Sequence, residues 1–322
     1  MQTKNIIGID VSKDKLSLFN DSNDSFEEIN NSNESLLNYI IKHNLEKEKC
    51  KIGLESTGDY SFLPTKFFVE KGFETVIINP IISKRYIKST VRGKKTDKSD
   101  AEIITKMVKD NEGAVVTKNG LNIEKKTVLR TESKLTSISS DLKKLKQSLK
   151  LKKENGIDVS CALDEVERII GEIEVSTKKI MSKVVSEGQT RQEEIIDSIP
   201  GFAVKLSAIV SAEAGDISRF NDAKEFVAYA GLDPKVFQSG NSIRLGKITK
   251  RGNPYLRKAL FLSAHVSRMH DPEIKAFYEK KMSEGKHYKT VICAVARKLC
   301  LRIFSVAKED RLYEVRLFEA VS

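Results

Sequence analysis

Four carboxylates in the first third of the chain could carry out metal-dependent chemistry together. Asp10 lies in a short apolar run of the kind that forms a buried strand, Glu55 ends another, and Asp97 and Asp100 stand three residues apart. Residues three apart share a face of a helix, so Asp97 and Asp100 are expected to point the same way. A buried carboxylate is costly unless a cation or a partner takes its charge. If the four converge, hard divalent ions such as Mg²⁺, about 4 Å apart in two-metal sites, are the usual counter-charge.

A purely structural interpretation of these acids stays open on spacing alone. Thr96 or Asp97 can cap a helix, and acids are favourable in a first turn. Asp97 and Asp100 could then mark only a capped, solvated helix start, and Glu55 a residue of the turn that follows it.

Residues 5–110 have the pattern of an α/β unit that would position these acids. Strands are expected at 5–11, 15–20, 26–29, 51–55 and 74–78, and helices at 32–43, 62–71 and about 98–109. This order resembles that of the ribonuclease H fold, in which the first acid lies on the first strand, another ends the fourth strand and others begin a late helix. The order therefore favours convergence of the four carboxylates.

A basic stretch leads into the last pair of acids. It contains Lys84, Arg85, Lys88, Arg92, Lys94 and Lys95. Positive charge at this place could guide a phosphate backbone toward the metals. A flexible, solvated loop is the alternative.

The net charge is concentrated in one part of the chain. The 322 residues carry a formal charge of +11, and 39% of them are hydrophobic, enough for the cores of two or three domains. Residues 231–310 hold 17 basic and 7 acidic groups, and the rest of the chain is nearly neutral. Such a block indicates a polyanionic partner, most often nucleic acid, rather than a merely solvated surface.

Cysteine, histidine and apolar patterns exclude several other classes. The four cysteines form no CxxC pair and the four histidines no ligand pattern, which makes a zinc site unlikely in a protein expected in the reducing cytoplasm. No apolar run approaches the roughly 18 residues of a membrane span, and early charged residues leave no signal-peptide core. We therefore expect no membrane partner.

Residues 120–187 predict two long amphipathic helices. Apolar residues recur at three- and four-residue steps on both sides of Glu154-Asn155-Gly156. The pattern is typical of a helical hairpin or a coiled-coil arm, which would mediate oligomerisation or grip nucleic acid.

The C-terminal part predicts further helices around a basic loop. Ile199-Pro200-Gly201, between an apolar helix and one that ends at Gly215, resembles a helix-hairpin-helix motif, with a plain helical turn as the alternative. The segment 234–254 predicts a loop with a short hairpin, between helices at 220–229 and 255–268, and a last helix is expected at 288–307. Asn253 as N-cap and Pro254 at the first helical position make a phosphate-binding helix start flanked by basic residues.

Seven short blocks carry a resemblance to a known family. They are Gly8-Ile9-Asp10-Val11-Ser12-Lys13, Glu55-Ser56-Thr57-Gly58, Thr96-Asp97-Lys98-Ser99-Asp100-Ala101, Ile199-Pro200-Gly201, Ala228-Tyr229-Ala230-Gly231-Leu232, Gln238-Ser239-Gly240 and Thr249-Lys250-Arg251-Gly252-Asn253. Together they resemble the DEDD transposases of bacterial insertion sequences, the IS-one-ten family, described as bridge-RNA-guided recombinases. The resemblance covers nearly the whole chain except the arm.

The resemblance implies a fold and a division of the chain. The fold class would be α/β plus mainly α, with a RuvC-like, ribonuclease H-like domain at 1–115, a coiled-coil arm at 116–190 and a C-terminal transposase domain with the helix-hairpin-helix-like segment at 191–322.

The resemblance also implies a site in two parts. Asp10, Glu55, Asp97 and Asp100 would hold Mg²⁺, with Mn²⁺ as the substitute, and Ser239 would be the nucleophile of a covalent phosphoserine link to DNA. Ser242 is equally exposed by sequence, and Ser239 is chosen because it occupies the family's Gln-Ser-Gly position.

The implied partners are DNA, a guide RNA encoded by the element, and further copies of the chain. A homo-oligomer, dimer or tetramer, would share the site between protomers in the bacterial cytoplasm, at the nucleoid. Nucleic-acid contacts in the C-terminal part are expected from Arg244, Lys247, Lys250, Arg251 and Asn253.

Three other functions compete with this one. A RuvC-like, metal-dependent endonuclease would use the same acids with water as nucleophile, and Ser239 would be structural. A non-enzymatic nucleic-acid-binding regulator would not explain three acid clusters in ribonuclease H order. A sugar-kinase or actin-type ATPase shares the Gly-Ile-Asp strand but lacks evident adenosine motifs here.

Overall fold

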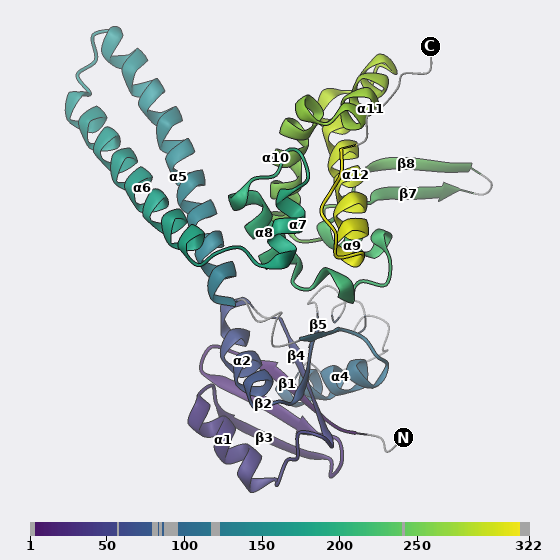
Figure 1. The fold of residues 1–322 in the computed structure, drawn as a ribbon. Helices are drawn as coiled ribbons and strands as arrows, with labels where there is room; N and C mark the ends of the chain where they lie inside the picture. The colour runs from purple at the N-terminus through teal and green to yellow at the C-terminus, as the bar shows by residue number, and fades with distance from the viewer. Residues whose placement is uncertain are drawn as a thin grey trace. The chain divides into compact units, whose positions relative to one another are not determined.

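The chain folds into two compact units, Met1–Leu121 and Asn122–Ser322 (Figure 1). This computed structural model describes residues 4–56, 58–78, 83, 86, 96–116, 123–239 and 242–315. The division lies near the predicted end of the first domain. The long helices of the predicted arm fall in the same unit as the C-terminal helices.

The N-terminal unit is built on a mixed six-stranded sheet. Its strands are β1 (Asn5–Val11), β2 (Lys15–Asn20), β3 (Ser25–Asn30), β4 (Cys50–Glu55), β5 (Glu74–Ile78) and β6 (Ala114–Val116), in the order β3-β2-β1-β4-β5-β6. The first three strands pair antiparallel, β4 joins β1 in parallel and β5 joins β4 in parallel, while β6 closes the edge antiparallel. This arrangement is compatible with a ribonuclease H-like domain.

Helices cover both faces of this sheet. They are α1 (Asn33–Lys42), α2 (Phe62–Glu70), which follows a short 3₁₀ turn at Gly58–Ser61, and α4 (Asp97–Lys109). In β1, Ile7 and Ile9 belong to a core shared with α1 and α2, whereas Ile6 belongs to a core shared with α4. Because side chains alternate along a strand, Asp10 falls on the α4 face with Ile6.

The C-terminal unit is mainly helical. Its elements are α5 (Ile123–Glu154), α6 (Ser160–Ser186), α7 (Arg191–Asp197), α8 (Val204–Ala214), a 3₁₀ turn at Ile217–Arg219, α9 (Ala223–Ala230), β7 (Pro234–Ser239), β8 (Ser242–Ile248), α10 (Pro254–His270), α11 (Pro272–Ser283) and α12 (Tyr288–Lys308). One apolar core joins α7 to α12 with the base of α5, and α12 packs on α7, α9, α10 and α11.

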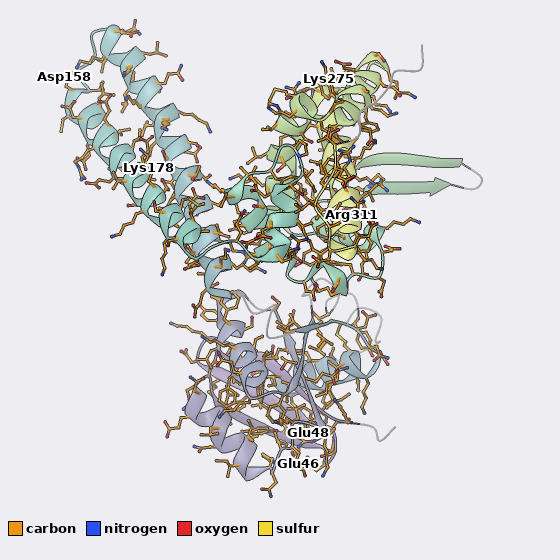
Figure 2. All side chains as sticks on the ribbon, viewed as in Figure 1. Glu46, Glu48, Asp158, Lys178, Lys275 and Arg311 are labelled. Carbon is orange, nitrogen blue, oxygen red and sulfur yellow. The ribbon has the colours of Figure 1, made fainter. Side chains whose placement is uncertain are left out.

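Helices α5 and α6 form the predicted hairpin. Leu149 of α5 packs with Leu163, Val166 and Ile170 of α6, in a small core of their own. Two ion pairs, Lys143–Glu174 at 2.7 Å and Lys146–Glu167 at 2.9 Å, also join the helices and fit an antiparallel pairing. Asp158 in the connecting turn and Lys178 on α6 point outward (Figure 2).

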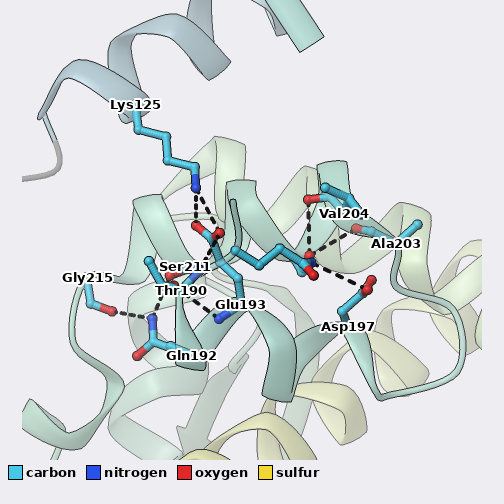
Figure 3. Close-up of polar contacts among 11 residues, drawn as sticks. Lys125, Thr190, Gln192, Glu193, Asp197, Ala203, Val204, Ser211 and Gly215 are labelled. Carbon is cyan, nitrogen blue, oxygen red and sulfur yellow. Dashed lines mark hydrogen bonds and ion pairs between the residues drawn. The ribbon is translucent and has the colours of Figure 1, made fainter. Parts of the chain in front are cut away.

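The root of α5 is held by a buried ion pair. Lys125 donates to Glu193 of α7 at 2.8 Å, and the two side chains are 7% and 2% exposed (Figure 3). Glu193 is also the third residue of α7 and forms a capping box with Thr190. Nearby, Gln192 ties α7 to the end of α8, donating to the Ser211 hydroxyl at 2.8 Å and to the Gly215 carbonyl at 2.9 Å. These contacts hold α5 in the C-terminal unit.

Two features were not fully predicted. Helix α11 begins with Asp271 as N-cap and Pro272 at its first position, a start signal that the weak apolar periodicity of the segment hides. The short hairpin expected within 234–254 is present as β7–β8, with an irregular register between Pro234 and Val236 and with strand bounds that the sequence did not predict; Figure 1 shows it projecting from the helices of its unit. The predicted N-cap of α10, Asn253, is confirmed.

The cysteines differ in exposure. Cys50 and Cys300 are buried, Cys293 is half-buried, and Cys161 in the first turn of α6 is exposed. Across the described residues, no helix combines the length and apolar character needed to cross a membrane.

Candidate active site

Asp10 and Glu55 lie side by side at one edge of the sheet. In the parallel pairing of β1 and β4, Ile9 stands opposite Leu54. The next residue of each strand is therefore an acid, and both acids lie at the carboxyl ends of neighbouring strands, on the α4 face. Both are half-buried.

Two glycines let α4 lie directly against these strands. A Cβ on Gly8 would overlap the Ala101 carbonyl and would lie 2.8 Å from the Thr105 nitrogen, and one on Gly53 would lie 2.6 Å from a Val108 methyl group. No larger residue fits at either position without moving the helix. Since Gly8 faces Ala101, the preceding turn of α4 lies toward Asp10.

That preceding turn carries the other two acids. A capping box fixes it: the Thr96 hydroxyl accepts from the Ser99 nitrogen at 3.2 Å, and the Ser99 hydroxyl accepts from the Thr96 nitrogen at 2.9 Å. The cap predicted at Thr96 is confirmed, and Asp97 is the first residue of the helix. Asp97 is exposed and Asp100 half-buried.

Asp10 interacts electrostatically with each of the other three acids. Burial raises the pKa of Asp10, and the carboxylates of Asp100, Glu55 and Asp97 raise it further, against a lowering backbone hydrogen bond from Val11. Each of the other three acids thus acts on Asp10 through space. Acids far apart in the sequence, on β1, β4 and α4, are therefore near enough to interact with Asp10, and their joint use as metal ligands stays a prediction.

The acids fit a hard divalent cation by charge and by ligand type. Carboxylate oxygens are the donors that Mg²⁺ and Mn²⁺ prefer. As the side chains stand, no three His, Cys, Asp or Glu residues in the described ranges lie close enough to hold one ion between them.

Glu55 has a partner that sequence reasoning missed. The hydroxyl of Ser83, a 3% exposed residue that follows β5, donates to Glu55 Oε1 at 2.9 Å. Gly8 and Gly53 were also not predicted to matter, although a glycine inside a strand is a signal of close approach by another element. Ser83 offers no comparable signal, because a serine in a loop is common.

The basic stretch before α4 lies outside the described residues. This concerns Lys84, Arg85, Lys88, Arg92, Lys94 and Lys95. Their role in guiding a phosphate backbone stays a prediction from the sequence.

Ser239 ends the first strand of the β7–β8 hairpin. It pairs with Ser242 across the antiparallel ladder, so both stand at the tip of the hairpin, separated by two residues. For Ser239 and Arg244 the structure describes the backbone, which lies in β7 and β8. The position presents Ser239 at the end of a projecting element.

The base of the hairpin joins two of the C-terminal sequence blocks. The Thr249 nitrogen donates to the Asp233 carbonyl at 2.8 Å, and the Asn253 nitrogen donates to the Tyr229 carbonyl at 2.8 Å. A Cβ on Gly252 would overlap that same Tyr229 carbonyl. The two blocks therefore fold as one support for the hairpin.

Basic residues surround the start of α10. Lys247, Lys250 and Arg251 are exposed beside its N-terminus. Asn253 caps the helix. Its Oδ1 accepts hydrogen bonds from the backbone nitrogens of Tyr255 and Leu256, at 3.0 and 3.1 Å, and its Nδ2 donates to Glu213 at 2.7 Å. Three exposed cations next to a helix N-terminus suit an anion.

The Pro-Gly turn between α7 and α8 packs against α10. Gly201 has φ +103°, and a Cβ there would lie 2.6 Å from both the Ser263 carbonyl and the Ser267 nitrogen. Two short helices joined by this turn match the predicted segment. Its use as a DNA-binding helix-hairpin-helix stays a prediction.

Comparison with known proteins extends the similarity to both units. Residues 7–149 match a family model for DEDD transposases of the IS110 kind, described as Transposase, and residues 193–279 match one described as Transposase IS116/IS110/IS902 family.

Individual relatives agree with these matches. The chain is 25% identical over 330 residues to the pilin gene-inverting protein of Moraxella bovis, covering 98% of this chain and 100% of that one. It is 25% identical over 279 residues to the transposase for insertion sequence element IS1111A of Coxiella burnetii, covering 76% and 74%. A 43.6 kDa protein of insertion element IS110 from Streptomyces coelicolor is 30% identical over 123 residues, 38% of this chain and 30% of that one. The matches show that the chain is a DNA transposase or recombinase that belongs to the IS110 family of DEDD transposases.

Proposed function

We propose that the chain cuts and rejoins DNA strands at a site where Asp10, Glu55, Asp97 and Asp100 hold Mg²⁺ or Mn²⁺. The observation that carries this proposal is the arrangement of three elements: Asp10 and Glu55 lie at the ends of neighbouring parallel strands, and α4, which carries Asp97 and Asp100 in its first turn, packs against Gly8 of the same strand as Asp10. The family implies dependence on a divalent metal. When bound, the metal would offset the negative charge of the carboxylates and stabilise charge on the phosphodiester.

We assign the nucleophile to Ser239. Its hydroxyl oxygen forms a bond to phosphorus, the bond from phosphorus to the leaving sugar oxygen breaks, and the serine proton is lost to a base while the leaving oxygen gains one. The product is a phosphoserine that keeps the energy of the broken bond for rejoining, so ATP is not needed. The position of Ser239 at a hairpin tip supports this assignment.

We assign nucleic-acid contacts to the basic residues. Lys247, Lys250 and Arg251 are exposed at the start of α10, and the 231–310 block carries most of the net charge. A guide RNA that selects the DNA sites by base pairing is part of the proposal. The name of the Moraxella relative refers to gene inversion, and rejoining cut strands in a new order would serve inversion and insertion alike.

A homo-oligomer, dimer or tetramer, is also part of the proposal. The α5–α6 hairpin supports it, since Ile138, Leu145 and Val175 on its surface are 39%, 45% and 68% exposed. Apolar residues at such positions are suited to a partner helix.

A covalent-trapping experiment tests the mechanism. Purified protein, the RNA of its element and matching DNA are incubated with Mg²⁺ and separated on a denaturing gel. We expect a protein–DNA adduct that is lost in Ser239→Ala and in Asp10→Ala, with Ser242→Ala as the matched control that keeps it. Cleavage without an adduct, surviving Ser239→Ala but not Asp10→Ala, would instead establish a RuvC-like nuclease that uses water.

A further inference from the structure

A buried hydroxyl is bonded to one of the proposed metal ligands. Ser83 Oγ donates to Glu55 Oε1 at 2.9 Å, and Ser83 is 3% exposed. β5 pairs in parallel with β4, and its last residue, Ile78, stands opposite Glu55. The chain that leaves β5 thus starts at the sheet edge where Glu55 lies, and Ser83 follows five residues later.

This hydrogen bond acts on the orientation of the carboxylate. The terminal torsion of a glutamate is broad, so an unsupported carboxylate samples many orientations. A donor on Oε1 restricts that rotation and leaves Oε2 and the remaining lone pair of Oε1 for a cation. Groups that hold metal-binding carboxylates in this way typically govern affinity as much as geometry.

A second hydrogen bond holds the same segment at another point. The Tyr86 hydroxyl donates to Asp110 Oδ2 at 2.8 Å, and Asp110 is the C-cap of α4. Tyr86 also packs against the core that α4 shares with the sheet. Of the described residues after β5, Ser83 is therefore bonded to the acid and Tyr86 to the scaffold.

We propose that Ser83 is a positioning residue, which sets the Glu55 carboxylate in the orientation that binds the divalent metal. The inference rests on the proposed function, because it takes Glu55 as a ligand. In the sequence, Ser83 directly precedes Lys84 and Arg85.

Metal binding by the full-length, metal-free chain tests this role without any measure of activity. Mn²⁺ is titrated in, and free Mn²⁺ is counted by electron paramagnetic resonance. We expect Ser83→Ala to bind Mn²⁺ about 10- to 100-fold more weakly than the wild type. Ser83→Thr keeps the hydroxyl and should restore most of the affinity. Tyr86→Phe is the matched control: it removes a hydrogen bond of the same segment that touches no proposed ligand, and should bind as the wild type does.

The outcomes separate this inference from the proposed function. Loss of affinity in Glu55→Gln together with wild-type affinity in Ser83→Ala would overturn the role of Ser83 and leave the metal site standing. Wild-type affinity for Mn²⁺ in Glu55→Gln would overturn the proposed metal site itself. Equal losses in Ser83→Ala and Tyr86→Phe would also overturn the inference, because the segment's stability and not the Glu55 bond would then matter. If Ser83→Ala does not fold, Ser83→Cys, with a weaker donor of similar size, gives the same comparison.

Discussion

Asp10 is a residue whose ionised form is disfavoured by the folded chain. Burial and three like charges raise its pKa above that of an unfolded aspartate. Between the two pKa values the folded state binds more protons than the unfolded state, so this group lowers stability as pH rises through that window. Above the window the cost is constant, and a bound cation would offset it.

We expect Asp10→Asn to raise the melting temperature of the metal-free protein at neutral pH. The substitution removes a buried charge and its repulsion by Asp100, Glu55 and Asp97. The gain should vanish at a pH below about 3.9, where an ordinary aspartate is protonated in both states. Calorimetry at several pH values measures this gain in melting temperature. Asp59→Asn, at an exposed position, is the control. A gain that does not depend on pH would contradict this account.

Gly8 is the second residue on which the site depends. In Gly8→Ala the new methyl group would overlap the Ala101 carbonyl, so α4 must move away from β1. We expect a loss of about 1–3 kcal/mol in the free energy of unfolding, the usual cost of overpacking, and weaker Mn²⁺ binding because Asp97 and Asp100 move with the helix.

Urea unfolding and Mn²⁺ titration measure the two effects. Gly171→Ala is the opposite case, since a Cβ there meets nothing within 4 Å in the middle of α6. Gly171→Ala should increase the free energy of unfolding by about 0.5–1 kcal/mol. A Gly8→Ala protein with unchanged stability would show that the helix does not need the glycine.

At the scale of elements, the buried pair Lys125–Glu193 is one of the contacts that anchor α5. Replacing Lys125 by Met leaves Glu193 buried at 2% exposure without its cation. We expect a loss of about 3–5 kcal/mol for the unit that contains α5. The double change Lys125→Met with Glu193→Gln should lose less, because no charge remains buried and glutamine can keep the capping box.

Urea denaturation followed by circular dichroism reports this loss. Lys178→Met, on the exposed surface of α6, is the control and should cost little. Equal effects of Lys125→Met and Lys178→Met would mean that the buried pair does not hold α5.

Local patterns predicted most of the elements, but not their contacts. Alternation and helical periodicity sufficed for β1 to β5 and for the helices other than α11, and the caps at Thr96 and Asn253 are local signals. β6 is only three residues long and exists by pairing with β5, so tertiary contact and not local sequence defines it. A short hairpin was expected within 234–254, and only the bounds of β7 and β8 were missed, because the stretch is rich in Gly, Ser and basic residues.

The sequence was enough to identify the acids of the candidate site. It was not enough to predict the contacts that orient them. The order of the elements places Asp10, Glu55, Asp97 and Asp100 together, and the pKa of Asp10 agrees. The Ser83–Glu55 bond joins residues 28 positions apart, a contact that no sequence period encodes.

For the whole molecule, charge should govern affinity for DNA. The excess of basic groups at 231–310 predicts binding that weakens steeply with salt, because each neutralised phosphate releases counterions. We expect Lys250→Gln or Arg251→Gln to reduce the slope of log affinity against log salt by about 0.9 each on duplex DNA.

Fluorescence anisotropy at several salt concentrations measures the slope. Lys66→Gln, an exposed lysine on α2, serves as control and should leave it unchanged. Identical slopes for all variants would place the contacts elsewhere on the chain.

The cysteines offer a spectroscopic use. Cys161 is exposed near the turn that joins α5 and α6, whereas Cys50 and Cys300 are buried. Burial also raises the pKa of the half-buried Cys293 thiol, which slows its reaction with electrophiles at neutral pH. A maleimide fluorophore should therefore attach mainly at Cys161 without any engineered cysteine. Energy transfer between labelled copies would then report, in real time, how hairpins from different protomers approach one another as DNA is added.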